Sequence, residues 1–325
     1  MKNKFLLILA LGIAALTGCS NTKTASESAT TVTEPQPKVI FNGDSAYKHV
    51  KVQCDFGPRV PNTEAHGKCG DYLVATLNGY GAKVTEQKVD LTAFDGTILH
   101  ARNIIAEFYP EKANRICLLA HWDCRPWADN DPSEANHTKP VMGANDGASG
   151  VGVLLEIARL LATNEPQCGI DILLSDAEDW GESDADNAES WAMGTRYWVK
   201  NVHREGYRYP NFGILLDMVG DAEAKFLKEY YSVQSAPSVV NQVWTTAASL
   251  GYSDKFVNDY GGAMTDDHVA LIEAGIPCID IIDQRSNSQT GFCPQWHTVD
   301  DVLKHINKGT LTAVGQTVTT IIFGK

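Results

Sequence analysis

Three short segments of the sequence carry residues that suit a metal ion. Asp146 lies in the glycine-rich stretch 143–150, Asp179 follows an apolar run, and His297 lies in the segment 295–300. Carboxylate and imidazole ligands without cysteine suit Zn²⁺ in a catalytic site that keeps one position open for water or substrate. Each residue alone is weak evidence, because an acidic residue before a helix is commonly an N-cap. Their combination predicts a zinc ion held by Asp146, Asp179 and His297.

A further carboxylate, Glu178, directly precedes Asp179. If Asp179 turns toward the metal, its neighbour points into the same crevice, where a carboxylate can shuttle a proton. The alternative is an ordinary surface acid. Four acidic residues crowd into the short segment 171–179, which favours the functional interpretation. We therefore predict that Glu178 is a general acid and base.

These residues must be positioned by alternating strands and helices. Short runs, most of them apolar instead of alternating, predict strands at 103–108, 116–120, 170–174, 212–216 and 276–282. Runs that are apolar throughout are typical of a mostly parallel sheet covered on both faces. One-sided apolar periodicity predicts helices at 149–164, 238–250 and 308–323. This alternation indicates the α/β class, as a three-layer α/β/α sandwich around a mixed, mostly parallel sheet.

In such a sheet, ligands bind in a crevice beyond the carboxyl ends of the strands. His121 and Asp123 directly follow one predicted strand, Asp176 and Asp179 follow the next, and Asp217 follows a third. We therefore expect polar side chains from three strand ends to meet in one crevice.

These motifs together resemble the zinc aminopeptidase superfamily, which has a phosphorylase/hydrolase-like α/β/α fold. The C-terminal part looks more specifically like glutaminyl-peptide cyclotransferases of the animal type and their bacterial lipoprotein relatives. The resemblance covers residues 39–325. The residues that carry it are His121-x-Asp123, Asp146, Glu178-Asp179, Asp217, Asp266-Asp267-His268, Phe292, Trp296-His297-Thr298 and Asp300-Asp301.

The resemblance implies an enzyme that converts N-terminal glutamine of peptides and proteins to pyroglutamate and releases ammonia. It implies one zinc ion per chain, bound by Asp146, Asp179 and His297, and it gives the acid/base role to Glu178. The animal members have Glu where Asp179 stands, so this ligand is shorter by one methylene.

The resemblance also assigns residues around the substrate. Asp217 and Asp266 match two catalytic acids that share a hydrogen bond beside the substrate. Phe292 and Trp296 match the aromatic walls of the glutamine pocket, with core packing as the alternative for both.

Two other functions stay open at this point. A two-zinc aminopeptidase holds two ions ~3.5–4 Å apart, and His121 and Asp217 stand where the second ion would bind. A non-catalytic lipoprotein that binds peptides or metal would be expected to lack a ligand or the base, whereas this sequence keeps both.

The N-terminus carries an export signal. Lys2 and Lys4 precede the apolar run 5–16, and Leu16-Thr-Gly-Cys19 resembles a bacterial lipobox. We predict a signal peptide at 1–18, lipidation of Cys19, a flexible tether over 19–38 and a single catalytic domain over 39–325. The alternative is a plain signal peptide with an incidental cysteine. The expected product is a membrane-anchored lipoprotein facing the periplasm, in a membrane that the sequence does not identify.

Composition excludes other classes of function. With 27 Lys+Arg against 40 Asp+Glu, the formal charge of -13 offers no basic surface, so we expect no nucleic-acid partner. No apolar run reaches the ~20 residues of a spanning helix. Seven of the eight cysteines follow Cys19, and an odd number leaves at least one thiol free. The lack of a Cys-x-x-Cys pair argues against a cysteine zinc site, and Cys117 and Cys278 are predicted to be buried in the core. The sequence predicts no oligomeric state.

Overall fold

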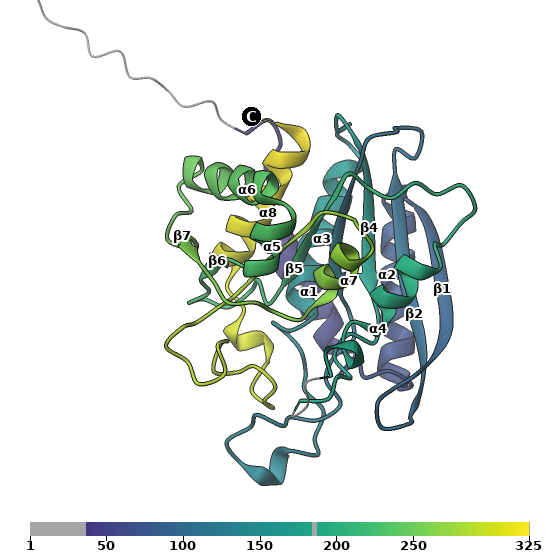
Figure 1. Cartoon of the computed structure of the whole chain (residues 1–325), viewed down its shortest axis with the longest axis vertical. Coiled ribbons are helices and arrows are strands. Elements are labelled where there is room, and N and C mark those ends of the chain that lie inside the picture. The colour runs from purple at the N-terminus through teal and green to yellow at the C-terminus, as the bar shows by residue number, and fades with distance from the viewer. Residues whose placement is uncertain (1–36, 184–186, 325) are drawn as a thin grey trace, which may run out of the picture. The chain divides into compact units, whose positions relative to one another are not determined.

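The computed structural model describes residues 37–183 and 187–324. A six-stranded sheet in the order β1-β2-β4-β3-β5-β8 runs through its centre (Figure 1). Strands β4, β3, β5 and β8 are parallel to one another, whereas β2 is antiparallel to both β1 and β4. The sheet is therefore mixed and mostly parallel, as predicted. Its strands are β1 (Lys83–Thr92), β2 (Ile98–Phe108), β3 (Arg115–His121), β4 (Gly169–Ser175), β5 (Phe212–Asp217) and β8 (Cys278–Ile282).

All five predicted strands are present, and three further strands among the described residues were not predicted. β1 escaped prediction because it lies at the edge of the sheet, where its residues alternate between partly covered and exposed. The remaining two, β6 (Phe226–Lys228) and β7 (Phe256–Tyr260), pair with each other in a separate two-stranded sheet.

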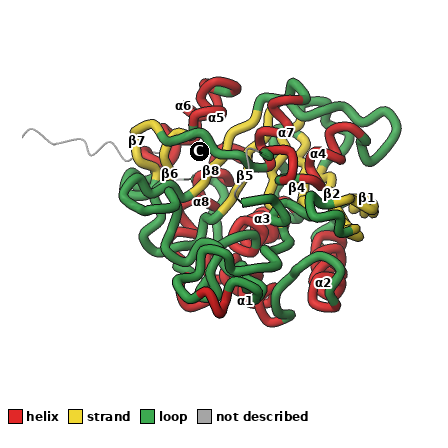
Figure 2. The backbone as a smooth tube through the Cα atoms, turned by 60° about the horizontal axis from the view of Figure 1, so that its bottom comes forward, coloured by secondary structure: helices red, strands yellow, loops and turns green. Residues whose placement is uncertain are grey.

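Helices cover both faces of the large sheet (Figure 2). Successive residues of β3 point to opposite faces, so Leu118 joins the apolar cluster beneath α1, α3 and α8, while Leu119 joins the cluster beneath α4 and α7. The predicted three-layer α/β/α sandwich is confirmed. The helices are α1 (Gly43–Asp55), α2 (Glu64–Gly79), α3 (Ala148–Leu161), α4 (Met193–Lys200), α5 (Tyr230–Ser235), α6 (Pro237–Ser249), α7 (Asp267–Glu273) and α8 (Lys308–Phe323).

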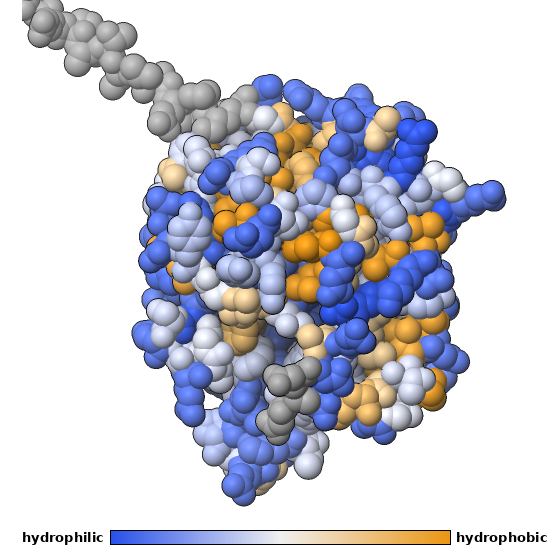
Figure 3. All heavy atoms as spheres, viewed as in Figure 1, coloured by the Kyte–Doolittle hydropathy of each residue, from blue (hydrophilic) through white to orange (hydrophobic). Residues whose placement is uncertain are grey.

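The predicted signal peptide at 1–18, the Cys19 lipidation site and tether residues 20–36 lie outside the described residues. None of the described helices is both long and apolar enough to cross a membrane. The surface in Figure 3 is largely hydrophilic, with hydrophobic side chains gathered near the centre of that face.

The cysteines within the described chain are free thiols. Cys117 and Cys278 are fully buried in the cluster beneath α4 and α7, as predicted.

Candidate active site

The carboxyl ends of β3, β4 and β5 bring the predicted site residues together. His121 is the last residue of β3, Asp217 is the last residue of β5, and Glu178 and Asp179 follow β4. Asp146 lies in the loop that leads into α3. The cavity between these segments measures about 50 Å³. It is lined by Asp146, Glu178, Asp179, Trp191, Asp217, Met218, Met264, Thr265, Asp266, Ile282, Phe292, Trp296 and His297.

The three predicted metal ligands converge on one point. Donor atoms of Asp146, Asp179 and His297 all lie within 4.8 Å of one another. Nε2 of His297 is 3.2 Å from Oδ1 of Asp179 and 3.6 Å from Oδ2 of Asp146. The shorter side chain of Asp179 therefore reaches the other two ligands.

The surroundings of these ligands fit a cation. All three side chains are buried, and neither carboxylate oxygen of Asp179 accepts a hydrogen bond among the described residues. The only nearby positive groups within the described chain are Nε2 of His297 (3.2 Å) and Nη1 of Arg125 (3.5 Å), both on the side of Oδ1. Burial raises the pKa of Asp179, and the adjacent charge of Asp146 raises it further. Unpaired buried carboxylates are costly unless a cation binds them. Two carboxylates and one imidazole are a donor set that zinc accepts in catalytic sites.

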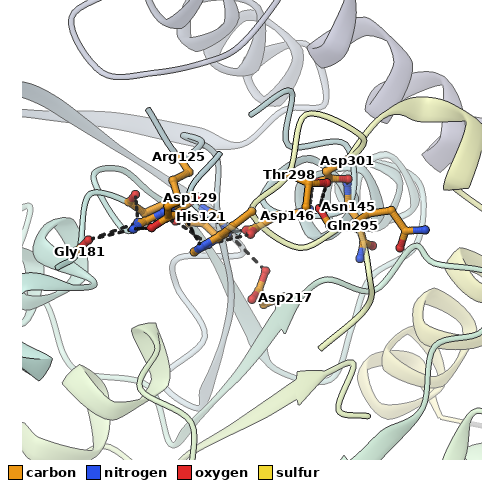
Figure 4. Close-up of polar contacts among 12 residues, drawn as sticks. His121, Arg125, Asp129, Asn145, Asp146, Gly181, Asp217, Gln295, Thr298 and Asp301 are labelled. Atoms are coloured by element: carbon orange, nitrogen blue, oxygen red, sulfur yellow. Dashed lines mark hydrogen bonds and ion pairs between the residues drawn. The ribbon is translucent and has the colours of Figure 1, made fainter. Parts of the chain in front are cut away.

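Neighbouring side chains orient His297. Oδ1 of Asp129 lies 3.5 Å from Nδ1 of His297, so Nε2 is left to face Asp146 and Asp179. Arg125 holds Asp129 by two hydrogen bonds, from Nε (2.8 Å) and Nη2 (2.6 Å) (Figure 4). A carboxylate that binds the second nitrogen of a ligating histidine sets the tautomer and the direction of the ring.

Aromatic rings enclose the same imidazole. The ring of Trp296 stacks on His297 at a centroid distance of 3.8 Å, and Trp191 lies nearly parallel to it at 6.1 Å.

Buried acids also hold the backbone on which the ligands are mounted. The carboxylate of Asp123 accepts hydrogen bonds from the backbone N–H groups of Glu178 and Asp179, each at 3.2 Å. The carboxylate of Asp301 accepts hydrogen bonds from the N–H groups of Asn145 (2.8 Å) and Asp146 (3.0 Å). Both ligand loops are thus tied to side chains from other parts of the chain.

Glu178 lines the cavity next to Asp179, and only 7% of it is exposed. Burial raises its pKa well above the usual range, and the charges of Asp266 and Asp179 act in the same direction. A carboxyl group with a raised pKa is suited to accept and return a proton near neutral pH.

Two further acids and a histidine form the other side of the cavity. Nε2 of His121 lies 3.0 Å from Oδ1 of Asp146 and 3.3 Å from Oδ1 of Asp217 (Figure 4). Burial raises the pKa of Asp217 to about 6. Burial also raises the pKa of Asp266, and the charge of Asp217 raises it further. His121, Asp146 and Asp217 could themselves hold a metal ion, so geometry alone leaves room for a second one.

Both predicted aromatic wall residues line the cavity. The rings of Phe292 and Trp296 are 4.5 Å apart. Three residues of this region were not predicted: Trp191, which lines the cavity, and the pair Arg125 and Asp129. An aromatic residue in the polar segment 187–191 was the one signal that could have revealed Trp191. Arg125 and Asp129 gave no comparable signal, because their contacts arise only in the folded chain.

The sequence matches the model of Peptidase family M28 over residues 103–322. Three solved structures resemble the chain closely, and each alignment covers 88% of it. They are the glutaminyl cyclase of Bacteroides thetaiotaomicron bound to N-acetylhistamine (52% identity, TM-score 0.85, 99% of that chain), the glutaminyl cyclase of Tannerella forsythia (49%, 0.86, 100%) and a Zn-dependent exopeptidase from Parabacteroides distasonis (49%, 0.86, 99%).

Curated relatives are more distant. Aminopeptidase YwaD of Bacillus subtilis is 27% identical over 276 residues, which span 82% of this chain and 54% of YwaD. Glutaminyl-peptide cyclotransferase of Drosophila melanogaster is 23% identical over 270 residues, which span 75% of this chain and 70% of that protein. The match thus spans about half the length of YwaD.

Proposed function

The chain belongs to peptidase family M28, and from this premise we propose that it is a zinc-dependent glutaminyl-peptide cyclotransferase. Its substrates are peptides and proteins with N-terminal glutamine, and its products are pyroglutamate and ammonia. The observation that carries the proposal is the complete set of ligands and acids around a small cavity, in a chain about half identical to solved glutaminyl cyclases.

Asp146, Asp179 and His297 would hold one zinc ion per chain. When bound, the ion supplies Lewis acidity at the side-chain amide carbonyl of the substrate. Asp129 and Asp123 keep the imidazole and the backbone of Asp179 in position for this task.

Glu178 moves the proton. The nucleophile is the α-amine of the substrate, whose pKa of ~7.7–8.0 requires only a modest base. Glu178 accepts a proton from the amine as its nitrogen bonds to the amide carbon and the five-membered ring closes. The bond from that carbon to the amide nitrogen then breaks, Glu178 returns the proton to the leaving nitrogen, and ammonia departs.

The other cavity residues hold the substrate in a reactive conformation. Asp217 and Asp266 line the cavity, where they are placed to bind its nitrogen atoms, and the charge of Asp217 raises the pKa of Asp266. Phe292 and Trp296 pack against the short glutamine side chain, which keeps the amine close to the amide carbon.

The second candidate is a two-zinc aminopeptidase, because His121, Asp146 and Asp217 cluster closely enough to bind another ion. Incubation with glutaminyl and leucyl arylamides distinguishes the two. A cyclotransferase removes ammonia from the glutaminyl compound and leaves the leucyl compound intact, whereas an aminopeptidase releases free arylamine. Zinc content per chain, measured on the same sample, gives one ion for the first function and two for the second.

The N-terminal signals support a periplasm-facing lipoprotein held in the membrane through Cys19. An acidic chain is not attracted to anionic lipid, so the acyl chains would provide the attachment. Replacing Cys19 with Ser should abolish incorporation of labelled fatty acid and release the protein from the membrane fraction. Retention of the label would contradict this localisation.

A further inference from the structure

Three aromatic side chains form a continuous surface outside the cavity, which we call the aromatic ledge and define as Phe94, Trp127 and Trp180. The rings of Phe94 and Trp127 meet edge to face at 6.2 Å, and those of Trp127 and Trp180 at 5.5 Å. None of the three is buried, and Phe94 is 42% exposed. The ledge is built from three separate segments: the turn between β1 and β2, the segment after β3, and the segment after β4.

The ledge lies close to the cavity. The guanidinium carbon of Arg125 lies 5.1 Å from the ring of Trp127 and 4.9 Å from the ring of Trp191, which lines the cavity. Trp180 follows the metal ligand Asp179 in the chain. One side chain, Arg125, thus separates the ledge from the cavity wall.

Core packing explains this arrangement only in part. Trp180 covers a small apolar cluster that contains Ala93, and its Nε1 donates a hydrogen bond to Asp95 (3.4 Å). Phe94 lies in the turn between two strands, where the neighbouring Ala93 is buried and Phe94 is exposed. An aromatic ring exposed in a turn contributes little to the stability of the core. Its position beside Trp127 therefore calls for another explanation.

The small size of the cavity indicates that a bound peptide would extend beyond it, toward the ledge. A volume of about 50 Å³ is far below the ~300–1,000 Å³ of pockets that bury a whole small ligand. The cavity is therefore too small to enclose a peptide, so the residues that follow the terminal glutamine must lie outside it. Extended peptide advances ~3.3–3.6 Å per residue. The third and fourth residues of a substrate can therefore reach Trp127, which is separated from Trp191 in the cavity wall only by the buried side chain of Arg125.

We propose that the aromatic ledge is an extended substrate site that binds aromatic or large apolar side chains at the third and fourth positions of glutaminyl peptides. The inference rests on the proposed function. Aromatic rings favour edge-to-face and offset partners, and such pairs contribute beyond their buried area. The ledge thus favours peptides with an aromatic residue shortly after the terminal glutamine.

The test compares ammonia release from Gln-Gly-Phe-Phe-Gly, Gln-Gly-Ser-Ser-Gly and the dipeptide Gln-Gly, which is too short to reach the ledge. Wild-type enzyme should favour the Phe peptide over the Ser peptide by about fivefold in kcat/KM, through a lower KM. Phe94→Ser should reduce this preference to nearly one and leave Gln-Gly turnover unchanged. Phe94→Tyr should restore the preference.

Ile98→Ser is the matched control, because Ile98 begins β2 next to the same turn and is 45% exposed, but lies outside the ledge. It should keep the full preference. Turnover of Gln-Gly without any preference for the Phe peptide would overturn the ledge proposal alone. So would an equal loss by Phe94→Ser on all three peptides, since that reports a structural role. If the wild-type enzyme released no ammonia even from Gln-Gly, the proposed function would fail as well.

Discussion

At the scale of single residues, two adjacent acids are proposed to do different work in the site. Donor atoms of Asp179 lie within 4.8 Å of those of Asp146 and His297, whereas Glu178 does not belong to that group, and burial raises the pKa of both carboxyl groups. Asp123 holds the backbone of both residues, so one short segment would carry a metal ligand and a proton carrier.

Replacing Glu178 with Gln should lower kcat by about 10²–10⁴, because the amide can neither accept nor return a proton. Zinc content and melting temperature should remain those of the wild type, since the side chain is not predicted to bind the metal. Ammonia release and metal analysis on the same preparation test this. Undiminished turnover would remove Glu178 from the mechanism.

Replacing Asp129 with Asn should weaken zinc binding by about 10–100-fold, because the amide no longer provides a negative charge beside Nδ1 of His297. Competition with a chelator of known affinity measures the change. His297→Ala, which deletes a predicted ligand, should bind still more weakly. Asp254→Asn, at an exposed position, is the control and should bind zinc like the wild type. Unchanged affinity in Asp129→Asn would show that Asp129 does not support the ligand.

At the scale of elements, the approach of α3 to the sheet positions the loop that carries Asp146. A Cβ atom on Gly150 would lie 2.1 Å from the carbonyl oxygen of Leu216 in β5 and 3.0 Å from Cβ of Ala120 in β3. The helix can therefore pack this closely only because Gly150 has no side chain.

Gly150→Ala should lower the free energy of unfolding by about 1–3 kcal/mol, because α3 must move away from β5. It should also weaken zinc binding, since Asp146 lies in the loop that leads into α3. Gly67→Ala is the matched control, because nothing lies within 4 Å of its new Cβ. Within α2 it should be neutral or stabilising by up to about 1 kcal/mol. Denaturant titrations test both, and equal stability of the two variants would contradict the argument.

Much of the architecture follows from local patterns. Strands β3, β4 and β5 are mostly apolar and almost entirely buried because both faces are covered, and α8 matches the predicted range 308–323. β1 differs because an edge strand needs no continuous apolar run. α1 and α2 were also missed, since polar residues interrupt their apolar faces.

The site was predictable to the extent that each residue stands in a local motif. Asp146 could be recognised by the glycines around it, and His297 by the tryptophan that directly precedes it. The roles of Arg125 and Asp129 could not be inferred from the sequence. The ion pair between Asp129 and His297 joins segments more than 160 residues apart. Such contacts depend on tertiary structure and leave no periodicity in the sequence.

At the scale of the whole molecule, the buried region at the carboxyl ends of β3, β4 and β5 holds more acidic than basic groups. Burial raises the pKa values of Asp179, Asp217 (to about 6) and Asp266, and few buried cations lie nearby. A bound metal ion therefore offsets charge that the fold would otherwise have to neutralise by protonation.

Zinc-free protein should lose stability as pH rises from about 4 to 6, the interval between the unfolded and folded pKa values of Asp217. A carboxyl group whose pKa is higher in the folded state stabilises the fold below its unfolded pKa of ~3.9, and this contribution is lost as pH rises through the folded value. For Asp217, with a folded pKa of about 6, the loss is at most about 1.4 kcal/mol per pH unit.

The measurement compares melting temperatures with zinc and after chelation at several pH values. The difference in melting temperature between the zinc-bound and the chelated protein should increase toward pH 7.5, since ligand deprotonation also favours metal binding. Asp217→Asn should flatten the curve of the chelated protein. A gap that narrows with rising pH would show that the acidic cluster is compensated in another way.

The acid/base role proposed for Glu178, which lines the cavity, has a consequence for the order of events in protein maturation. Ring closure needs a free α-amine, and an internal glutamine has none because its nitrogen is part of a peptide bond. Glutamine therefore becomes a substrate only after proteolysis has made it the first residue, and the lactam that forms resists exopeptidases that need a free amino group.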